Sequence, residues 1–193
     1  MNNRTGFLLI IVPLALFIKS SCKTSEFGFK VMDLNGMVYD FSNRPVAHCD
    51  ISLAWWFKSS TDINGRFTIP KLPYGIYTLT AHKKGFEVYT EEIIIKNSEQ
   101  IVYFRIPSQN QLLDLVDEAL TANDLAAAEE LVERAYKIDS NSIETLYYYA
   151  TIKFKQNDYQ EAITFLEAAK DLGSKDTYID KFLTILWELH DAR

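Results

Sequence analysis

Two patterns of apolar residues divide the chain near residue 108. Between residues 27 and 107, apolar and polar residues alternate in short runs rich in β-branched and aromatic side chains, which is typical of strands with one buried face. The expected strands are Phe29–Leu34, Met37–Asp40, Cys49–Trp55, Arg66–Ile69, Gly75–His82, Glu92–Ile95 and Ile101–Ile106. Short strands separated by turn residues predict a small antiparallel β-sandwich.

Beyond Pro107 the apolar positions recur at steps of three and four residues, which is the period of an amphipathic helix. The expected helices are Gln109–Thr121, Leu125–Ile138, Ile143–Gln156, Tyr159–Leu172 and Asp176–His190. Ser108 is suited to cap the first helix, and Asp158 with Glu161 has the pattern of a capping box for the fourth. The fold class predicted is therefore a β-sandwich followed by an α-helical array.

The helical half repeats itself at an interval of 34 residues. Asn123-Asp124, Ala128, Leu131, Val132, Ala135 and Ile138 recur as Asn157-Asp158, Ala162, Phe165, Leu166, Ala169 and Leu172. This pattern resembles the tetratricopeptide repeat, a helix-turn-helix unit whose small residues let neighbouring helices approach closely. It departs from the family where Leu112 and Leu146 replace the first-helix aromatic residue. We interpret residues 108–193 as two repeats and a capping helix, with a generic array of helical hairpins as the alternative.

The alternating half carries five short elements in a fixed order. They are Gly36–Asp40, Pro45-Val46, Thr61–Phe67, Leu72–Tyr77 and Gly85-Phe86. Together they resemble the carboxypeptidase regulatory-like domain, a transthyretin-like sandwich, and the predicted domain spans residues 30–107. The resemblance implies a non-catalytic β-module of secreted and envelope proteins, with a role in folding or binding.

The first 21 residues predict a signal peptide. Arg4 precedes the apolar stretch Gly6–Ile18, which is shorter than the roughly 20 residues that a membrane-spanning helix needs. Ser20 and Ser21 then lead into Cys22, and the whole segment resembles a bacterial lipoprotein signal. One departure is Lys19, where such signals usually have an apolar residue.

The lipoprotein resemblance implies that Cys22 carries the lipid and that residues 22–29 form a tether. The expected location is the bacterial cell envelope, where a lipid anchor holds the protein at a membrane facing the periplasm or the cell exterior. The chain has two cysteines, so lipidation of Cys22 leaves Cys49 unpaired. We interpret Cys49 as a buried, free side chain in a strand, and a Cys22–Cys49 disulfide is the alternative.

Charge also separates the two halves. Residues 23–107 carry ten Lys and Arg against nine Asp and Glu, a balance of +1, whereas residues 108–193 carry eight against seventeen, a balance of −9. The acidic helical half argues against nucleic acid as a partner, because phosphates require basic side chains to neutralise them. It favours basic peptide segments, with a solvated surface that only aids solubility as the alternative.

The residue types that carry chemistry do not form a catalytic, metal or cofactor pattern. His48, His82 and His190 share no metal-ligand spacing, and the seven glycines form no phosphate-binding cluster. Asp62–Gly65 lacks the remaining ligands of a calcium loop and is interpreted as a turn. We therefore expect a protein that is not an enzyme and that uses no cofactor.

The helical array is the main candidate binding element. By analogy with the family, the first helix of each pair lines the concave face, which here assigns to it Asn110, Leu113, Asp117, Thr121, Glu144, Tyr147, Thr151 and Lys155. These side chains suit an extended or helical peptide from a partner protein. Contact with the chain's own β-domain is the alternative. Self-association is a further prediction, because an array of two repeats needs additional covering surface.

Trp55 and Trp56 are a second candidate contact. Adjacent residues of a strand point to opposite faces, so at most one of them is expected in the sandwich core. An exposed indole ring can stack on a sugar ring, which makes glycan or cell-wall binding the alternative function; packing under the neighbouring domain is the structural alternative. The main expectation is a noncatalytic envelope adaptor that binds another protein through its helices.

Overall fold

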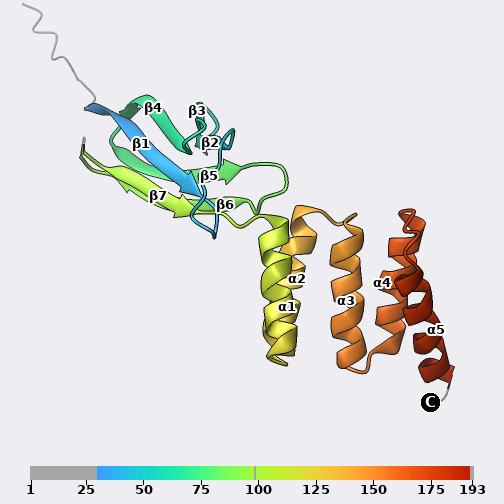
Figure 1. Cartoon of the computed structure of the whole chain (residues 1–193). Helices are drawn as coiled ribbons and strands as arrows, with labels where there is room; N and C mark the ends of the chain where they lie inside the picture. The colour runs from blue at the N-terminus through green and yellow to red at the C-terminus, as the bar shows by residue number, and fades with distance from the viewer. Residues whose placement is uncertain (1–29, 98, 192–193) are drawn as a thin grey trace, which may run out of the picture.

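A computed structural model describes residues 30–97 and 99–191, which form a β-domain joined end to end with a helical array (Figure 1). The strands are β1 (Val31–Tyr39), β2 (Asp50–Leu53), β3 (Phe57–Ser60), β4 (Arg66–Pro73), β5 (Gly75–His82), β6 (Tyr89–Ile95) and β7 (Ile101–Arg105). The helices are α1 (Gln109–Thr121), α2 (Leu125–Ile138), α3 (Ile143–Lys155), α4 (Tyr159–Asp171) and α5 (Thr177–Asp191). The predicted fold class is confirmed.

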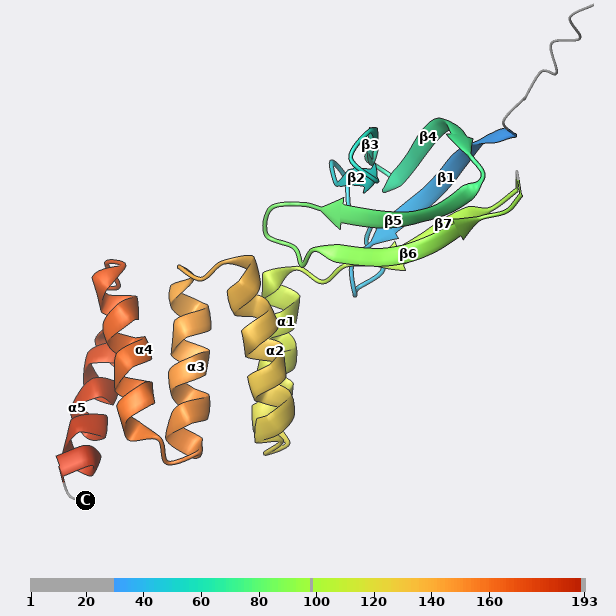
Figure 2. The ribbon, with the colours of Figure 1, turned by 180° about the vertical axis from the view of Figure 1, so that it is seen from behind.

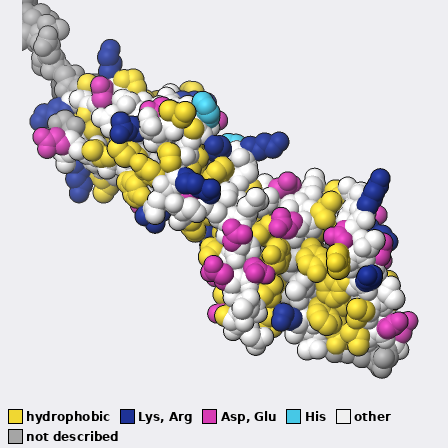
Figure 3. Space-filling view, viewed as in Figure 1, with side chains coloured by type: hydrophobic (Ala, Val, Ile, Leu, Met, Phe, Trp, Pro, Cys, Tyr) yellow, Lys and Arg dark blue, Asp and Glu magenta, His cyan; other side chains and the backbone are white. Residues whose placement is uncertain are grey.

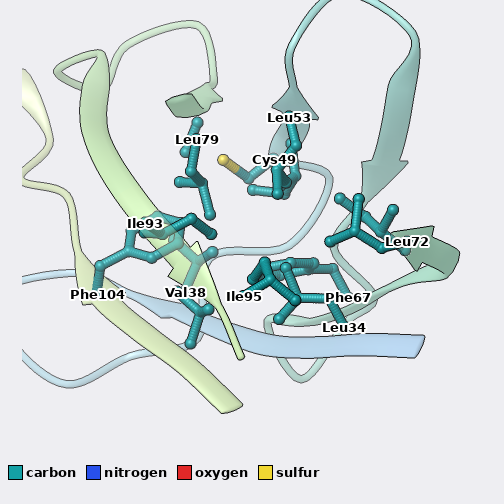
Figure 4. Close-up of a cluster of buried hydrophobic side chains, with 14 of the residues drawn as sticks. Leu34, Val38, Cys49, Leu53, Phe67, Leu72, Leu79, Ile93, Ile95 and Phe104 are labelled. Atoms are coloured by element: carbon teal, nitrogen blue, oxygen red, sulfur yellow. The ribbon is translucent and has the colours of Figure 1, made fainter. Parts of the chain in front are cut away.

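The β-domain consists of two sheets packed face to face. One sheet has the strand order β4-β1-β7 and the other β3-β2-β5-β6. Strand β7 pairs parallel to β1, whereas the other pairs are antiparallel. Side chains of both sheets meet in one buried cluster, in which Leu34 and Phe104 face Leu79 and Ile93 (Figure 4). Burial of this apolar surface is the main force that holds the two sheets together.

Strand β1 runs unbroken where the sequence predicts two strands with a turn between them. Gly36 lies between the two predicted strands. A Cβ atom at this position would lie 2.2 Å from Cζ of Phe67 and 2.9 Å from the carbonyl oxygen of Val102. The glycine therefore makes room for a buried ring and for close strand packing, and it does not mark a turn.

The predicted strand Cys49–Trp55 is also wrong at its C-terminal end. Strand β2 stops at Leu53, because Ala54 adopts a left-handed conformation with φ of 51° and starts a turn. The chain then returns as β3, a strand that the sequence reading missed, antiparallel to β2.

The helices begin and end within two residues of their predicted positions. The repeated Asn-Asp pair explains this agreement. Asn123 and Asn157 take left-handed conformations with φ of 57° and 65°, and the carboxylates of Asp124 and Asp158 then accept hydrogen bonds from the first turns of α2 and α4. A complete capping box forms at α1, between Ser108 and Gln111.

Four alanines at the 34-residue interval lie at helix contacts. Ala128, Ala135, Ala162 and Ala169 are fully buried, each with 0% of its surface exposed. They belong to the apolar clusters that join α1 with α2 and α3 with α4 and α5. Their small side chains allow the close approach that the repeat pattern predicts.

The two domains are joined by hydrogen bonds as well as by the peptide chain. The backbone N–H groups of Glu87 and Gln109 donate to the carbonyl oxygens of Pro107 and Gly85, each at 3.0 Å. The Arg134 guanidinium on α2 donates two hydrogen bonds of 2.8 Å to the Glu87 carboxylate. This bidentate pair fixes the loop between β5 and β6 against the array.

None of the helices within the described ranges is long and apolar enough to span a bilayer. The predicted signal peptide, Cys22 and the tether lie outside these ranges, as does Phe29. These assignments therefore stay predictions.

We predict that Ala128→Leu lowers the free energy of unfolding by about 1–3 kcal/mol, because the larger side chain does not fit between α1, α2 and α3. The matched control is Ala126→Leu, at an exposed position of the same helix, where we expect a change within about 0.5 kcal/mol. Urea unfolding of both variants measures the difference. Equal effects at the two positions would contradict close packing at Ala128.

A second prediction concerns Lys153, whose ammonium group contacts Glu129 on α2 at 2.8 Å and Glu161 on α4 at 3.1 Å. The hydrogen bond from Lys153 lowers the pKa of Glu129. A carboxylate with a lowered folded pKa stabilises the fold above its unfolded pKa, and this stabilisation is lost as the pH falls through the folded value.

Glu129→Gln should therefore reduce stability at pH 7 by about 0.2–1 kcal/mol, the range for partly exposed ion pairs. The difference from the natural protein should shrink as the pH falls below the pKa of Glu129, as measured by urea unfolding at a series of pH values. Glu188→Gln, at an exposed position of α5, is the control and should follow the natural protein throughout. A Glu129→Gln difference that does not depend on pH would refute the assignment.

Candidate functional site

Helices α1, α3 and α5 form one side of the array, here called the α1–α3–α5 face. In one view α1 and α5 lie in front of α2 and α4, and from behind the order is reversed (Figures 1 and 2). Each helix packs against the next in sequence, and α1 also touches α3. This alternation brings the first helix of each pair to the same side.

Seven of the eight predicted binding residues have side chains at the surface of these helices. Tyr147 is 37% exposed, Thr151 is half-buried, and the remaining five are exposed: Asn110, Asp117, Thr121, Glu144 and Lys155. The prediction that Leu113 lies on the binding face is wrong. Leu113 is 2% exposed and packs in a cluster with Leu112 and Ala135, so it supports the array from within.

Helix α5 contributes a stripe of apolar side chains that the sequence reading missed. Tyr178, Phe182, Ile185 and Leu189 follow one another at spacings of four, three and four residues, which places them along one side of the helix. Tyr178 is 70% exposed, Ile185 50% and Leu189 36%. The helical spacing was visible in the sequence, but a second stripe, with Ile179 at its start, is the one that faces the core.

The α5 stripe continues onto α3 through aromatic contacts. The Phe182 ring lies 6.1 Å from that of Tyr147 and 5.5 Å from that of Phe154, in edge-to-face arrangements. The result is a continuous hydrophobic surface between α3 and α5 (Figure 3). Such a surface on a water-exposed side is typical of a binding region.

A hollow of about 420 Å³ opens at one end of this surface, between the N-terminal turns of α3 and α5. Its lining is formed by Ile143, Glu144, Tyr147, Asp176, Tyr178 and Ile179. The apolar and aromatic side chains offer a contact for one anchoring side chain of a ligand. The two carboxylates at its rim favour a ligand that carries positive charge next to that anchor.

Acidic side chains border the surface on the α1 side (Figure 3). Burial, together with the negative charges of Asp117, Glu144 and Asp114, raises the pKa of Tyr148. These three carboxylates place negative charge close to Tyr148, in the region between α1 and α3. Lys155 is exposed at the C-terminal end of α3, whereas Lys181, in the second turn of α5, is exposed with its ammonium group 5.6 Å from the centre of the Tyr178 ring.

Trp55 and Trp56 lie in the turn between β2 and β3, and neither contributes to the sandwich core. The expectation that they point to opposite faces of a strand is wrong, because the strand ends at Leu53. Trp55 is 79% exposed and Trp56 56%. Their rings lie 5.0 Å apart at an angle of 82°. Binding of a glycan there stays a prediction.

Cys49 is a free cysteine with no exposed surface, as the sequence reading preferred. Burial raises the pKa of its thiol to about 11, so the side chain stays protonated and unreactive at neutral pH. The turn reading of Asp62–Gly65 also holds, since the Asp62 carboxylate accepts hydrogen bonds from the N–H groups of Asn64 and Arg66 at 2.8 Å. Over residues 30–97 and 99–191, His, Cys, Asp and Glu side chains do not cluster in a way that would hold a metal ion.

Comparison with known families identifies both domains. Residues 33–105 match the carboxypeptidase regulatory-like domain, and residues 119–186 match the tetratricopeptide repeat. Both resemblances drawn from the sequence are thus confirmed. A comparison with curated proteins finds no match.

Among solved structures, the chain is similar to a type II cohesin–X-dockerin complex from Acetivibrio cellulolyticus, with 14% identity and a TM-score of 0.36 over 42% of this chain and 60% of that one. It is also similar to the TIE protein of Bacillus anthracis, with 16% identity and a TM-score of 0.37 over 40% of this chain and 16% of that one. A third similar structure is BcpA, the major pilin subunit of Bacillus cereus, with 19% identity and a TM-score of 0.33 over 41% of this chain and 29% of that one. The chain thus spans less than two thirds of each of these chains.

Proposed function

We propose, from the pairing of a carboxypeptidase regulatory-like domain with a tetratricopeptide array, that this protein is a noncatalytic adaptor. It binds a peptide segment of another protein on its α1–α3–α5 face. The observation that carries the proposal is the exposed apolar stripe of α5, which joins Tyr147 and the hollow beside it into one surface. Both domain families are of the non-catalytic kind, and the repeat family consists of interaction scaffolds.

The chemistry of the face indicates what the peptide carries. Its apolar residues contact the surface between α3 and α5, because burial of exposed apolar area drives association. Its Lys or Arg residues lie toward Asp117 and Glu144, which supply the opposite charge. A basic, amphipathic segment combines these features.

The proposed location is the bacterial cell envelope. Residues 1–21 act as a signal peptide, Cys22 carries the lipid, and residues 22–29 tether the β-domain. The support is the sequence alone: a short apolar stretch that runs into Ser20-Ser21-Cys22. A lipid-anchored adaptor holds its partner near the membrane.

A photo-crosslinking residue placed at Tyr147 tests the binding face in intact cells. We expect it to capture a partner that the same residue at Leu172 does not capture. Leu172 is a matched control, because it is 43% exposed compared with 37% for Tyr147 but lies at the end of α4. Adding Ile185→Asp should abolish the crosslink, since it puts a charge into the apolar stripe.

Competition in a cell extract tests the charge assignment. A synthetic amphipathic peptide of Leu and Lys should compete with the crosslink, and a peptide of Leu and Glu in the same order should not. Equal crosslinking at residues 147 and 172, or equal competition by both peptides, would count against the proposal.

Mass spectrometry of the mature protein tests the anchor. We expect the chain to begin at Cys22 with the mass of attached lipid. Cys22→Ser should abolish the modification and release the protein from the membrane fraction. An unmodified Cys22, or a mature chain that starts elsewhere, would end the lipoprotein assignment without affecting the binding face.

A further inference from the structure

The β-domain has one end that lies away from the helices and from which the N-terminal segment leaves. At this end, here called the tether end, β1 and β5 begin and β4 and β6 finish. The backbone N–H of Tyr74 donates to the carbonyl oxygen of Lys30, where the described chain starts. The helical array joins the opposite end (Figures 1 and 2).

Exposed apolar side chains collect at the tether end. Ile76 and Ile94 are cross-strand partners on the outer surface of the four-stranded sheet, 63% and 47% exposed. Val31 at the start of β1 is 49% exposed, and Tyr74 before β5 is 37% exposed. Isolated exposed apolar residues are ordinary, but a group of four at one end of a small domain indicates a contact surface.

Basic side chains stand among these apolar ones. Lys30, Lys71 and Lys96 are exposed at the same end. Asp33, Glu92 and Glu99 are nearby exposed acids that offset this charge, and Glu92 is the cross-strand partner of Thr78. Apolar contact therefore contributes more than charge to the binding free energy of this surface. The lysines add to it with their aliphatic stems and charged ends.

The Trp55–Trp56 turn lies toward the same end. The backbone N–H of Ala54 donates to the carbonyl oxygen of Thr78 at 3.3 Å, and the Phe57 ring contacts that of Tyr77 at 5.9 Å. Thr78 is three residues along β5 from its first residue, or about 10 Å at the rise of a strand. The two tryptophans thus extend the apolar surface of the tether end.

We propose that the tether end and the Trp55–Trp56 turn rest on the surface of a lipid bilayer. Tryptophan, isoleucine and lysine together are the side chains that settle at a membrane interface. The two indole rings cross at 82°, so together they do not form one flat platform along which a sugar chain could lie. The inference rests on the proposed anchor at Cys22, from which eight residues reach at most about 28 Å to Lys30.

Charge favours one orientation at such a surface. The helical half has a balance of −9 and the β-half of +1, so anionic lipids repel the array. With the tether end on the membrane, the α1–α3–α5 face is held away from it in the aqueous space. The bilayer thus orients the adaptor and leaves its binding face accessible.

Tryptophan fluorescence tests the contact, because the chain has three tryptophans and Trp187→Phe leaves Trp55 and Trp56 as the emitters. The mature protein, which begins at Cys22, is coupled through the thiol of this residue to vesicles of anionic phospholipid that contain a maleimide headgroup. Cys49 is fully buried and does not compete. We expect a blue shift of the emission and loss of most of its intensity when the lipids are brominated.

Ile76→Ser with Ile94→Ser should weaken the quenching several-fold. Tyr103→Ser is the control, since Tyr103 is 53% exposed on the other sheet and should leave the quenching unchanged. Emission that stays unshifted and unquenched on coupled vesicles overturns the inference, as does a shift produced only by cell-wall polysaccharide. Because coupling replaces natural lipidation, this result is independent of the mass of the mature N-terminus.

Discussion

The close approach of paired helices at four alanines is the constraint on which the candidate binding surface depends. Ala128 and Ala162 leave no room for a larger side chain, so α1 and α3 each lie directly against a second helix. That packing brings α1, α3 and α5 to one side. It also holds α2 in the place from which Arg134 reaches the loop of the β-domain. The α1–α3–α5 face and the junction between the domains thus share one cause.

The helices could be predicted almost to the residue because their signals are local. An Asn that takes a left-handed conformation and an Asp that caps the next turn mark the same boundary in both repeats. The strands were less predictable where the cause lies elsewhere in the chain. Gly36 is small because Phe67 packs over it, and Ala54 takes a left-handed conformation that alanine does not signal. Neither cause is visible in neighbouring residues.

Only part of the candidate site could be predicted, again because the missing part depends on contacts between distant residues. The position of α1 and α3 as first helices of the repeats predicted that Tyr147 and the acids near it lie on the face. The same analogy made α5 a capping helix, so its exposed stripe was not predicted. Helix α5 has two apolar stripes: the one that includes Ile179 is buried in the core, whereas the other stays exposed except at Phe182, which packs at the edge of the core. Which of two stripes is free depends on how the helix is rotated against its neighbours. Leu113 shows the opposite case, a residue assigned to the surface that rotation places inside.

The parallel pairing of β1 with β7 determines how the protein would respond to mechanical load. The segment before β1 leaves at one end of this pair and the array follows β7 at the other, from Asn35 opposite Ile101 to Tyr39 opposite Arg105. A pull between a fixed N-terminus and a bound partner therefore slides the two strands along each other, and all hydrogen bonds between them resist together. A β-domain pulled in this direction unfolds at a higher force than one whose strands are separated one hydrogen bond at a time.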